Sequence, residues 1–212
     1  MTEPTGPAAD VVSVLRPGQH RAAAAAIAAG HADYPTFRHV YPDTRRRARA
    51  LRAFFSATVR DAIPLGSALA MWRGPLVAAT AVWLPPGGFP WSTRRKLAAT
   101  PALSRVLLAD PRAFPTFMRY GANVERAQPS EPHWYLEVLS VRPEHQRHGL
   151  GSRLVRPIIE RADGDGMPCH LETADPANIA FYRQFGFEVV DAALAVIPGG
   201  GPTLTTMRRP PR

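Results

Sequence analysis

Cysteine and lysine are almost absent from this sequence of 212 residues. Because Cys169 is the only cysteine, intrachain disulfide bonds and thiolate metal clusters are excluded. A chain without disulfide bonds suits a reducing compartment, so we expect a cytoplasmic protein. No apolar run approaches the ~20 residues of a membrane span, and the first residues lack the pattern of a secretory signal. We therefore expect no membrane partner.

Metal-binding patterns are also missing. The seven histidines show no metal-ligand spacing with acidic residues, so no metal site is expected. Cys169 precedes His170 in a short apolar segment, and we interpret it as a small core residue rather than as a nucleophile.

Negative charge is scarce: 17 Asp and Glu against 26 Lys and Arg give a net charge of +9. This balance favours anionic partners such as nucleic acid, membrane surfaces or phosphorylated small molecules. Two basic runs, Arg45–Arg47 and Arg94–Lys96, contain no aromatic residues on which bases would stack. We interpret both as solvated helix faces, so nucleic acid is not the expected partner. The positive surface is expected to steer a polyanionic small ligand instead.

The length fits one domain, and 45% apolar residues are enough for a core. Residues 1–10 are expected to be a disordered or frayed tail, and residues 11–212 a single domain. In the first half of the chain, the sequence predicts a strand at residues 11–15 and a helix at 21–29 that Gly30 ends. It also predicts a helix at 44–59 capped by Asp43 and a hairpin at 67–84. Residues 91–128 have a helical pattern and are interpreted as an insertion between two sheet-forming halves.

From His133 onward, strands and helices alternate, which predicts an α/β fold with parallel pairing. Residues His133–Val141 read as a buried central strand. The loop Gln146-x-x-Gly149-x-Gly151 follows, and an amphipathic helix comes next. This arrangement directs backbone N–H groups and the positive end of a helix dipole at an anion. A dinucleotide fingerprint is excluded because Leu154 stands where its third glycine belongs.

The loop and a second segment, Asp175–Phe187 after the strand Leu171–Thr173, resemble the GNAT (GCN5-related N-acetyltransferase) superfamily. The resemblance implies a mixed, mostly antiparallel sheet of about seven strands with parallel central strands and flanking helices. It also implies acetyl-CoA as a cosubstrate and no metal. Within the superfamily, the sequence looks most similar to the puromycin N-acetyltransferases, on residues 32–35, 38–39 and 81–83.

The resemblance also implies the residues that contact acetyl-CoA. The loop that would hold the pyrophosphate comprises Gln146, Arg147, His148, Gly149, Leu150, Gly151 and Ser152. A backbone amide from the segment Leu139, Ser140 and Val141 would bind the thioester carbonyl and stabilise an oxyanion. Asn178 would bond either the pantetheine arm or the edge of a strand, and Phe181 would lie beside the same ligand.

Two residues are expected to move protons. Tyr182 matches the family tyrosine that protonates the thiolate, although an aromatic packing role is the alternative. Glu137 is the first candidate for the base, because a carboxylate in an apolar strand is costly unless it is paired or faces a cleft. By the two-residue period of a strand it shares a face with Tyr135, Leu139 and Val141. Glu172 and His170 are second choices, and a water-relayed deprotonation needs no dedicated base.

The expected acceptor is the primary amine of a small molecule, acetylated by direct transfer in a ternary complex. An aminonucleoside-like antibiotic is one such amine, and resistance would be the role. Tyr34, Trp83 and Glu172 are expected to contact the acceptor, and the helical segment 91–128 favours a closed pocket. The alternative enzyme activity is acetylation of a protein N-terminus or lysine. The alternative without catalysis is an acyl-CoA-sensing or nucleic-acid-binding protein. A monomer or a homodimer is expected.

Overall fold

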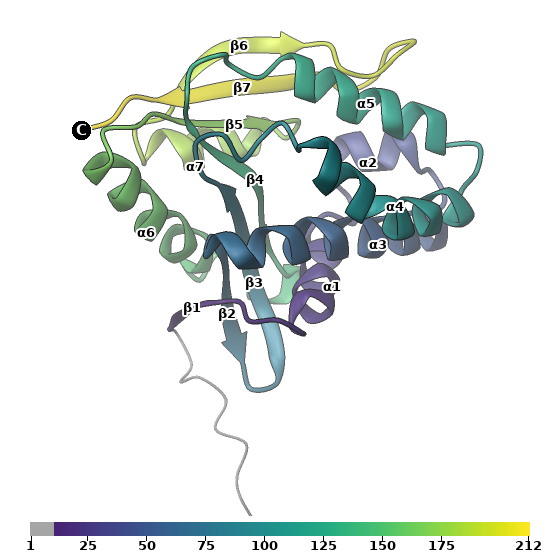
Figure 1. Ribbon diagram of the computed structural model, residues 1–212, viewed down its shortest axis with the longest axis horizontal. Helices are drawn as coiled ribbons and strands as arrows, with labels where there is room; N and C mark the ends of the chain where they lie inside the picture. The colour runs from purple at the N-terminus through teal and green to yellow at the C-terminus, as the bar shows by residue number, and fades with distance from the viewer. Residues whose placement is uncertain (1–10) are drawn as a thin grey trace, which may run out of the picture.

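A seven-stranded sheet organises the protein, whose computed structural model describes residues 11–212 (Figure 1). The tail expected for residues 1–10 lies outside the described residues. The strands follow the order β1-β2-β3-β4-β5-β7-β6. Their bounds are β1 (Val12–Val14), β2 (Ala68–Arg73), β3 (Leu76–Leu84), β4 (Trp134–Val141), β5 (Cys169–Thr173), β6 (Glu188–Leu194) and β7 (Leu204–Arg209).

Helices cover both faces of the sheet (Figure 1). They are α1 (His20–Gly30), α2 (Pro35–Val40), α3 (Thr44–Ala62), α4 (Thr93–Ala109), α5 (Phe114–Arg126), α6 (Leu150–Gly164) and α7 (Ala177–Arg183), with short 3-10 turns at Ile63–Leu65 and Pro143–His145. The predicted α/β architecture of about seven mostly antiparallel strands is confirmed. No helix within residues 11–212 combines the length and apolarity needed to cross a membrane.

Two hydrophobic cores lie on opposite faces of the sheet. The first joins α1 to α5 to the sheet through side chains such as Ile27, Phe55 and Val138. The second joins α6 and α7 to the other face through side chains such as Leu154 and Trp134. Cys169 is fully buried in the second core, so its interpretation as a core residue is confirmed.

The one parallel pairing in the sheet is short. β4 and β5 pair only at Trp134–Leu136 with 169–171, whereas β4 continues to Val141 against β3. β5 pairs along its whole length with β7 on its other side. The two central strands therefore separate after Leu136, and a gap opens between them within the described sheet.

Local sequence signals determine most of the helices and strands in the first half of the chain. The Asp43 side chain accepts a hydrogen bond of 2.8 Å from the Arg46 backbone N–H, so the predicted cap of α3 is confirmed. The interpretation of the first basic run as fully solvated is wrong for Arg47. That side chain is buried and donates to the Tyr41 backbone oxygen at 2.8 Å, where it satisfies a carbonyl at the end of α2.

Gly30 ends α1 for a reason other than backbone conformation, since its φ is not positive. A Cβ at this position would overlap the Ser140 hydroxyl and lie 2.7 Å from the Val141 backbone oxygen. The end of α1 therefore approaches β4 so closely that only glycine fits. This contact holds α1 against the strand that carries the gap.

Gly30→Ala is expected to destabilise the protein by about 1–3 kcal/mol, because overpacking forces α1 away from β4. Gly164→Ala is the matched control: Gly164 also ends a helix, and no described atom lies within 4 Å of a Cβ placed there. The control should be neutral or stabilise by up to about 1 kcal/mol. Chemical denaturation measures both free energies of unfolding, and equal effects in the two variants would contradict the close contact.

Candidate active site

A β-bulge places Glu137 at the mouth of the gap. Val138 lies opposite Val82 and Leu136 opposite Trp83, so Glu137 is the extra residue on β4. A bulge turns successive side chains toward the same face. The prediction that Glu137 shares a face with Leu139 and Val141 is therefore wrong. Those two side chains pack against the second core, whereas Glu137 lines a cavity on the side of α3 and α4.

Backbone groups of β4 point into the gap. The Arg142 N–H donates to the Ala78 oxygen at 3.0 Å, and antiparallel pairs alternate between bonded and non-bonded positions. Leu139 and Val141 therefore direct their N–H and C=O groups away from β3, toward the side that β5 has left. The Gln146 side-chain amide donates to the Val141 oxygen at 3.2 Å, and the Leu139 N–H remains available as a donor.

Ser140 does not face the gap, so its assignment as a contact of acetyl-CoA is wrong. Its side chain is buried on the opposite face, and its hydroxyl donates to the Ile27 oxygen of α1 at 3.4 Å. The alternation that frees Leu139 turns the backbone of Ser140 toward β3.

The loop between β4 and α6 presents an exposed anion-binding geometry. Gly149 has a φ of +74° and comes directly before the first turn of α6, where backbone N–H groups lack partners inside the helix. No described atom lies within 4 Å of a Cβ built on Gly149, so the loop surface there is open. Arg147, with a φ of +63°, and His148 are exposed on the same loop. This donor set fits a diphosphate.

A cavity of about 410 Å³ begins at the gap and extends beneath α4 and α5. Six predicted site residues line it: the catalytic candidates Glu137 and Tyr182, the acceptor contacts Tyr34 and Glu172, and the acetyl-CoA contacts Leu139 and Asn178. The helical segment 91–128 contributes α4 and α5 as one wall.

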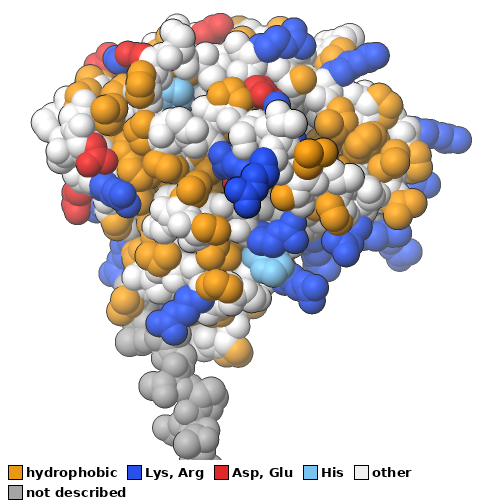
Figure 2. Space-filling view, viewed as in Figure 1, with side chains coloured by type: hydrophobic (Ala, Val, Ile, Leu, Met, Phe, Trp, Pro, Cys, Tyr) orange, Lys and Arg blue, Asp and Glu red, His pale blue; other side chains and the backbone are white. Residues whose placement is uncertain are grey.

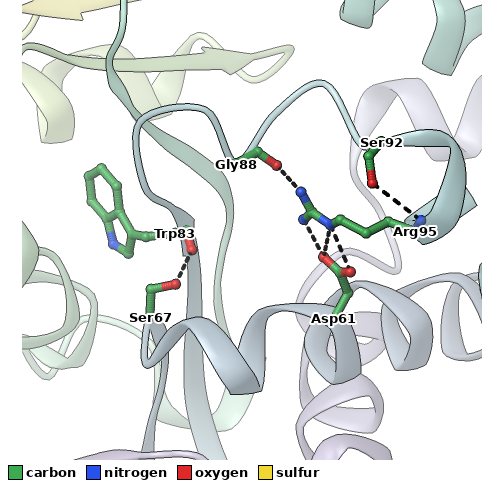
Figure 3. Close-up of polar contacts among 6 residues, drawn as sticks. All are labelled: Asp61, Ser67, Trp83, Gly88, Ser92 and Arg95. Atoms are coloured by element: carbon green, nitrogen blue, oxygen red, sulfur yellow. Dashed lines mark hydrogen bonds and ion pairs between the residues drawn. The ribbon is translucent and has the colours of Figure 1, made fainter.

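Trp83 is an exception, and its assignment as an acceptor contact is wrong. Its ring is fully buried in the second core, on the other face of the sheet from the cavity wall. Figure 3 shows this ring directed away from Asp61 and Arg95. The bulge at Val82/Trp83 falls beside it, so the residue fills the core behind the strand.

Tyr182 lines the cavity from α7. Its ring packs edge-on against Phe181 and Phe187, with centroids 5.1 and 5.9 Å away. Burial raises the pKa of its phenol well above the usual range, so the hydroxyl holds its proton at neutral pH. The Asn178 amide, one turn earlier, donates to Thr173 Oγ1 at 3.1 Å, which is the strand-edge alternative of the two predicted roles.

Glu137 is the unpaired carboxylate of the cavity. Its Oε2 is buried and has no hydrogen-bond partner among the described residues. Burial, more than the nearby Asp61 charge, raises the pKa of Glu137 to about 8. Arg95 opposes that rise, but its guanidinium is already engaged by both carboxylate oxygens of Asp61 and by the Gly88 oxygen (Figure 3).

The two alternative bases are paired with each other. Glu172 Oε1 lies 3.1 Å from His170 Nε2 and also accepts from the Gln128 amide. Glu172 lines the cavity, whereas His170 lines a separate surface pocket. Tyr34 is likewise engaged, because its hydroxyl accepts from the Ala174 N–H and so fastens α2 to the end of β5. Among these acids and bases, Glu137 is the one without a partner.

Sequence reasoning missed two parts of this site. The pattern over 44–59 predicted only a helix, yet Phe54 and Phe55 of that helix line the cavity. The Asp61–Arg95 ion pair joins α3 to α4 across 34 positions and had no sequence signal. Within residues 11–212 no group of His, Cys, Asp and Glu could hold a metal ion.

Comparisons with known proteins agree with this geometry. The model of the Acetyltransferase (GNAT) family matches residues 116–187, about a third of the chain. N-alpha-acetyltransferase RimI of Mycobacterium tuberculosis is 30% identical over 89 residues, which cover 42% of this chain and 56% of that protein. An uncharacterised N-acetyltransferase of Schizosaccharomyces pombe is 35% identical over 54 residues, or 26% of this chain and 22% of that protein. The chain thus matches at most about half the length of these curated relatives.

The structural likeness extends over nearly the whole chain. The crystal structure of histone acetyltransferase HPA2 and related acetyltransferase from Corynebacterium glutamicum superposes with a TM-score of 0.66 at 20% identity, covering 95% of this chain and 96% of that one. This likeness shows that the two chains share a fold. Over nearly its whole length the chain therefore has the fold of this acetyltransferase structure, and residues 116–187 match the GNAT family model.

Proposed function

We propose that this protein transfers the acetyl group of acetyl-CoA to the primary amine of a small molecule, by direct transfer in a ternary complex. One observation carries the proposal. The gap between β4 and β5 adjoins the exposed loop that carries Gly149 and Gly151, and a cavity beside it holds an unpaired carboxylate, Glu137, and a protonated phenol, Tyr182. These neighbouring features support an anion site, a base and an acid within one site.

The loop and the gap would bind the cosubstrate. The N–H groups of the first turn of α6, with Arg147 and His148, would hold the diphosphate. The Leu139 N–H would donate to the thioester oxygen, a contact typically worth a few kcal/mol in the transition state. Figure 2 shows Lys and Arg side chains in several separate places on the visible face, which suits general steering of a polyanion more than a continuous nucleic-acid footprint.

Glu137 and Tyr182 would handle the protons. Glu137 takes one proton from the bound ammonium, so that the amine nitrogen attacks the thioester carbonyl; the new C–N bond forms and the C–S bond breaks. Tyr182 gives its proton to the departing sulfur and recovers one from the acylated nitrogen. Free thiol, an amide and one released proton are the products.

The enclosed cavity supports a small acceptor, and the similarity to puromycin N-acetyltransferases would make it aminonucleoside-like. One observation favours a second function, acetylation of a protein N-terminus: the 30% identity with RimI. Free-thiol release from acetyl-CoA, measured with small amines and with peptides as acceptors, separates the two. Thiol release with small amines only supports the proposal; release with peptides only overturns it in favour of the second function. Binding of acetyl-CoA without thiol release would indicate a sensor.

Tyr182→Phe is expected to lower kcat by about 10²–10⁴-fold, because the departing sulfur loses its proton donor. The ring and its packing remain, so the Kd for CoA and the melting temperature should change little. A thiol-release assay measures kcat, and calorimetric titration with CoA measures the Kd. A kcat within twofold of the parent would show that this phenol only packs.

The pH profile tests Glu137. With a pKa of about 8, this carboxyl is protonated below that pH and becomes a base above it, so kcat/KM should rise through pH 8. Glu137→Gln should remove this inflection and lower kcat/KM by about 10²–10⁴-fold at pH 9. Glu160→Gln, an exposed change on α6, is the control and should keep the parent profile. An inflection that survives in Glu137→Gln would assign the base to another group.

The loop is tested by two alanine substitutions. Gly149→Ala forces a side chain into a left-handed conformation, which costs about 1–2 kcal/mol and should weaken CoA binding by about 5- to 30-fold. Gly164→Ala, at the other end of α6 and with no described atom within 4 Å of the new Cβ, is the control. Its Kd should stay within about twofold of the parent. Calorimetry with CoA gives both values, and equal binding by all three proteins would remove the loop from the site.

A further inference from the structure

Ten of the 29 residues that line the cavity are Phe, Tyr or Trp. More than half of the protein's Phe, Tyr and Trp residues line this one space. Several hold one another in edge-on contacts, such as Phe54 with Phe117 at 5.1 Å and Phe37 with Phe55 at 5.8 Å. Rings fixed in this way present edges and faces that favour another ring over a hydrated polar group.

Acids outnumber Lys and Arg among the residues that line the cavity. Glu137 and Glu172 face its interior, and the charge of Glu172 adds to the burial that raises the pKa of Glu137. Lys96 is the one Lys or Arg among the lining residues, and its Nζ lies 2.6 Å from Glu125 Oε1. His31 also lines the cavity, but burial lowers its pKa to about 4, so it is neutral. A cationic acceptor is favoured here, and a carboxylate on the acceptor would meet repulsion.

The volume of the cavity and the helix that closes one side limit the size of the acceptor. About 410 Å³ lies at the lower end of the range for small-molecule sites, and the reacting end of the cosubstrate needs part of it. Ala99, Ala102 and Leu103 of α4 close one side. A peptide chain would also need partners for its backbone N–H and C=O groups, and this apolar wall offers few.

We propose that the acceptor is a compact aromatic primary amine with a single positive charge and no carboxylate. Its ring would lie among Phe54, Phe55 and Phe117, and its ammonium would reach Glu137 at the bulge. The inference rests on the proposed acetyl transfer and names the substrate class of that site. It assigns Phe54, which is half-buried and lines the cavity, as a specificity-determining residue.

Matched acceptors test the class. Thiol release would be measured at saturating acetyl-CoA with 2-phenylethylamine, with phenylalanine, which adds only a carboxylate, and with ethanolamine, which lacks the ring. The kcat/KM for 2-phenylethylamine should exceed each of the others by at least tenfold. A preference for ethanolamine, phenylalanine or a peptide N-terminus would overturn the inference while leaving acetyl transfer intact. No thiol release with any acceptor would instead count against the proposed function.

A pair of variants tests the location of the ring. Phe54→Leu should raise the KM for 2-phenylethylamine at least fivefold and leave the KM values for ethanolamine and acetyl-CoA unchanged. Phe114→Leu is the control: Phe114 is also half-buried beside the first core but does not line the cavity. Melting temperatures and the Kd of 2-phenylethylamine in the presence of CoA accompany the kinetics, so that a loss of folding is recognised. Equal effects of Phe54→Leu on both amines, or equal effects of the two variants, would overturn the assignment.

Discussion

The separation of β4 from β5 is the constraint on which the rest of the structure depends. Three parallel pairs join these strands, and then each follows a different neighbour: β4 continues along β3, and β5 along β7. Backbone groups that a continuous sheet would pair are left facing a gap, with the Leu139 N–H among them. Because α6 begins just after the same end of β4, a candidate anion site adjoins the gap.

The bulge at Glu137 adds a cost that the fold alone does not explain. A buried carboxylate with an unpartnered oxygen is unfavourable, and nothing in the packing requires an acid there. Polar groups left unsatisfied in a cavity commonly mark sites of chemistry or ligand binding. The Asp61–Arg95 pair strengthens this view, since it ties α4 to α3 over the same space and keeps the guanidinium occupied beside the acid.

Much of the fold and the loop of the candidate site followed from the sequence, because their signals are local: the cap at Asp43, the glycines of the 146–151 loop, the alternation after His133. Errors arose where long-range contacts decide. The face of Glu137 depends on a bulge against β3, which no two-residue period reveals. Arg47 and Arg95 were interpreted as solvated because they lie in basic runs. In the fold, Arg47 is buried and donates to a backbone oxygen, and Arg95 pairs with Asp61. The aromatic side chains of the cavity meet because α3 and α5 lie side by side, and only the tertiary structure shows this arrangement.

The most direct measurement is a titration of the isotope-labelled protein with coenzyme A alone, followed through backbone amide resonances. We expect the largest shifts at the amides of Gly149 to Ser152 and of Leu139, with small changes along β6 and β1. The loop adjoins Leu139, since a Cβ on Gly151 would lie 3.7 Å from the Leu139 side chain, so a ligand that passes from the loop into the gap must perturb both groups. Saturable binding that leaves both groups unperturbed, or no binding at millimolar coenzyme A, would contradict the account.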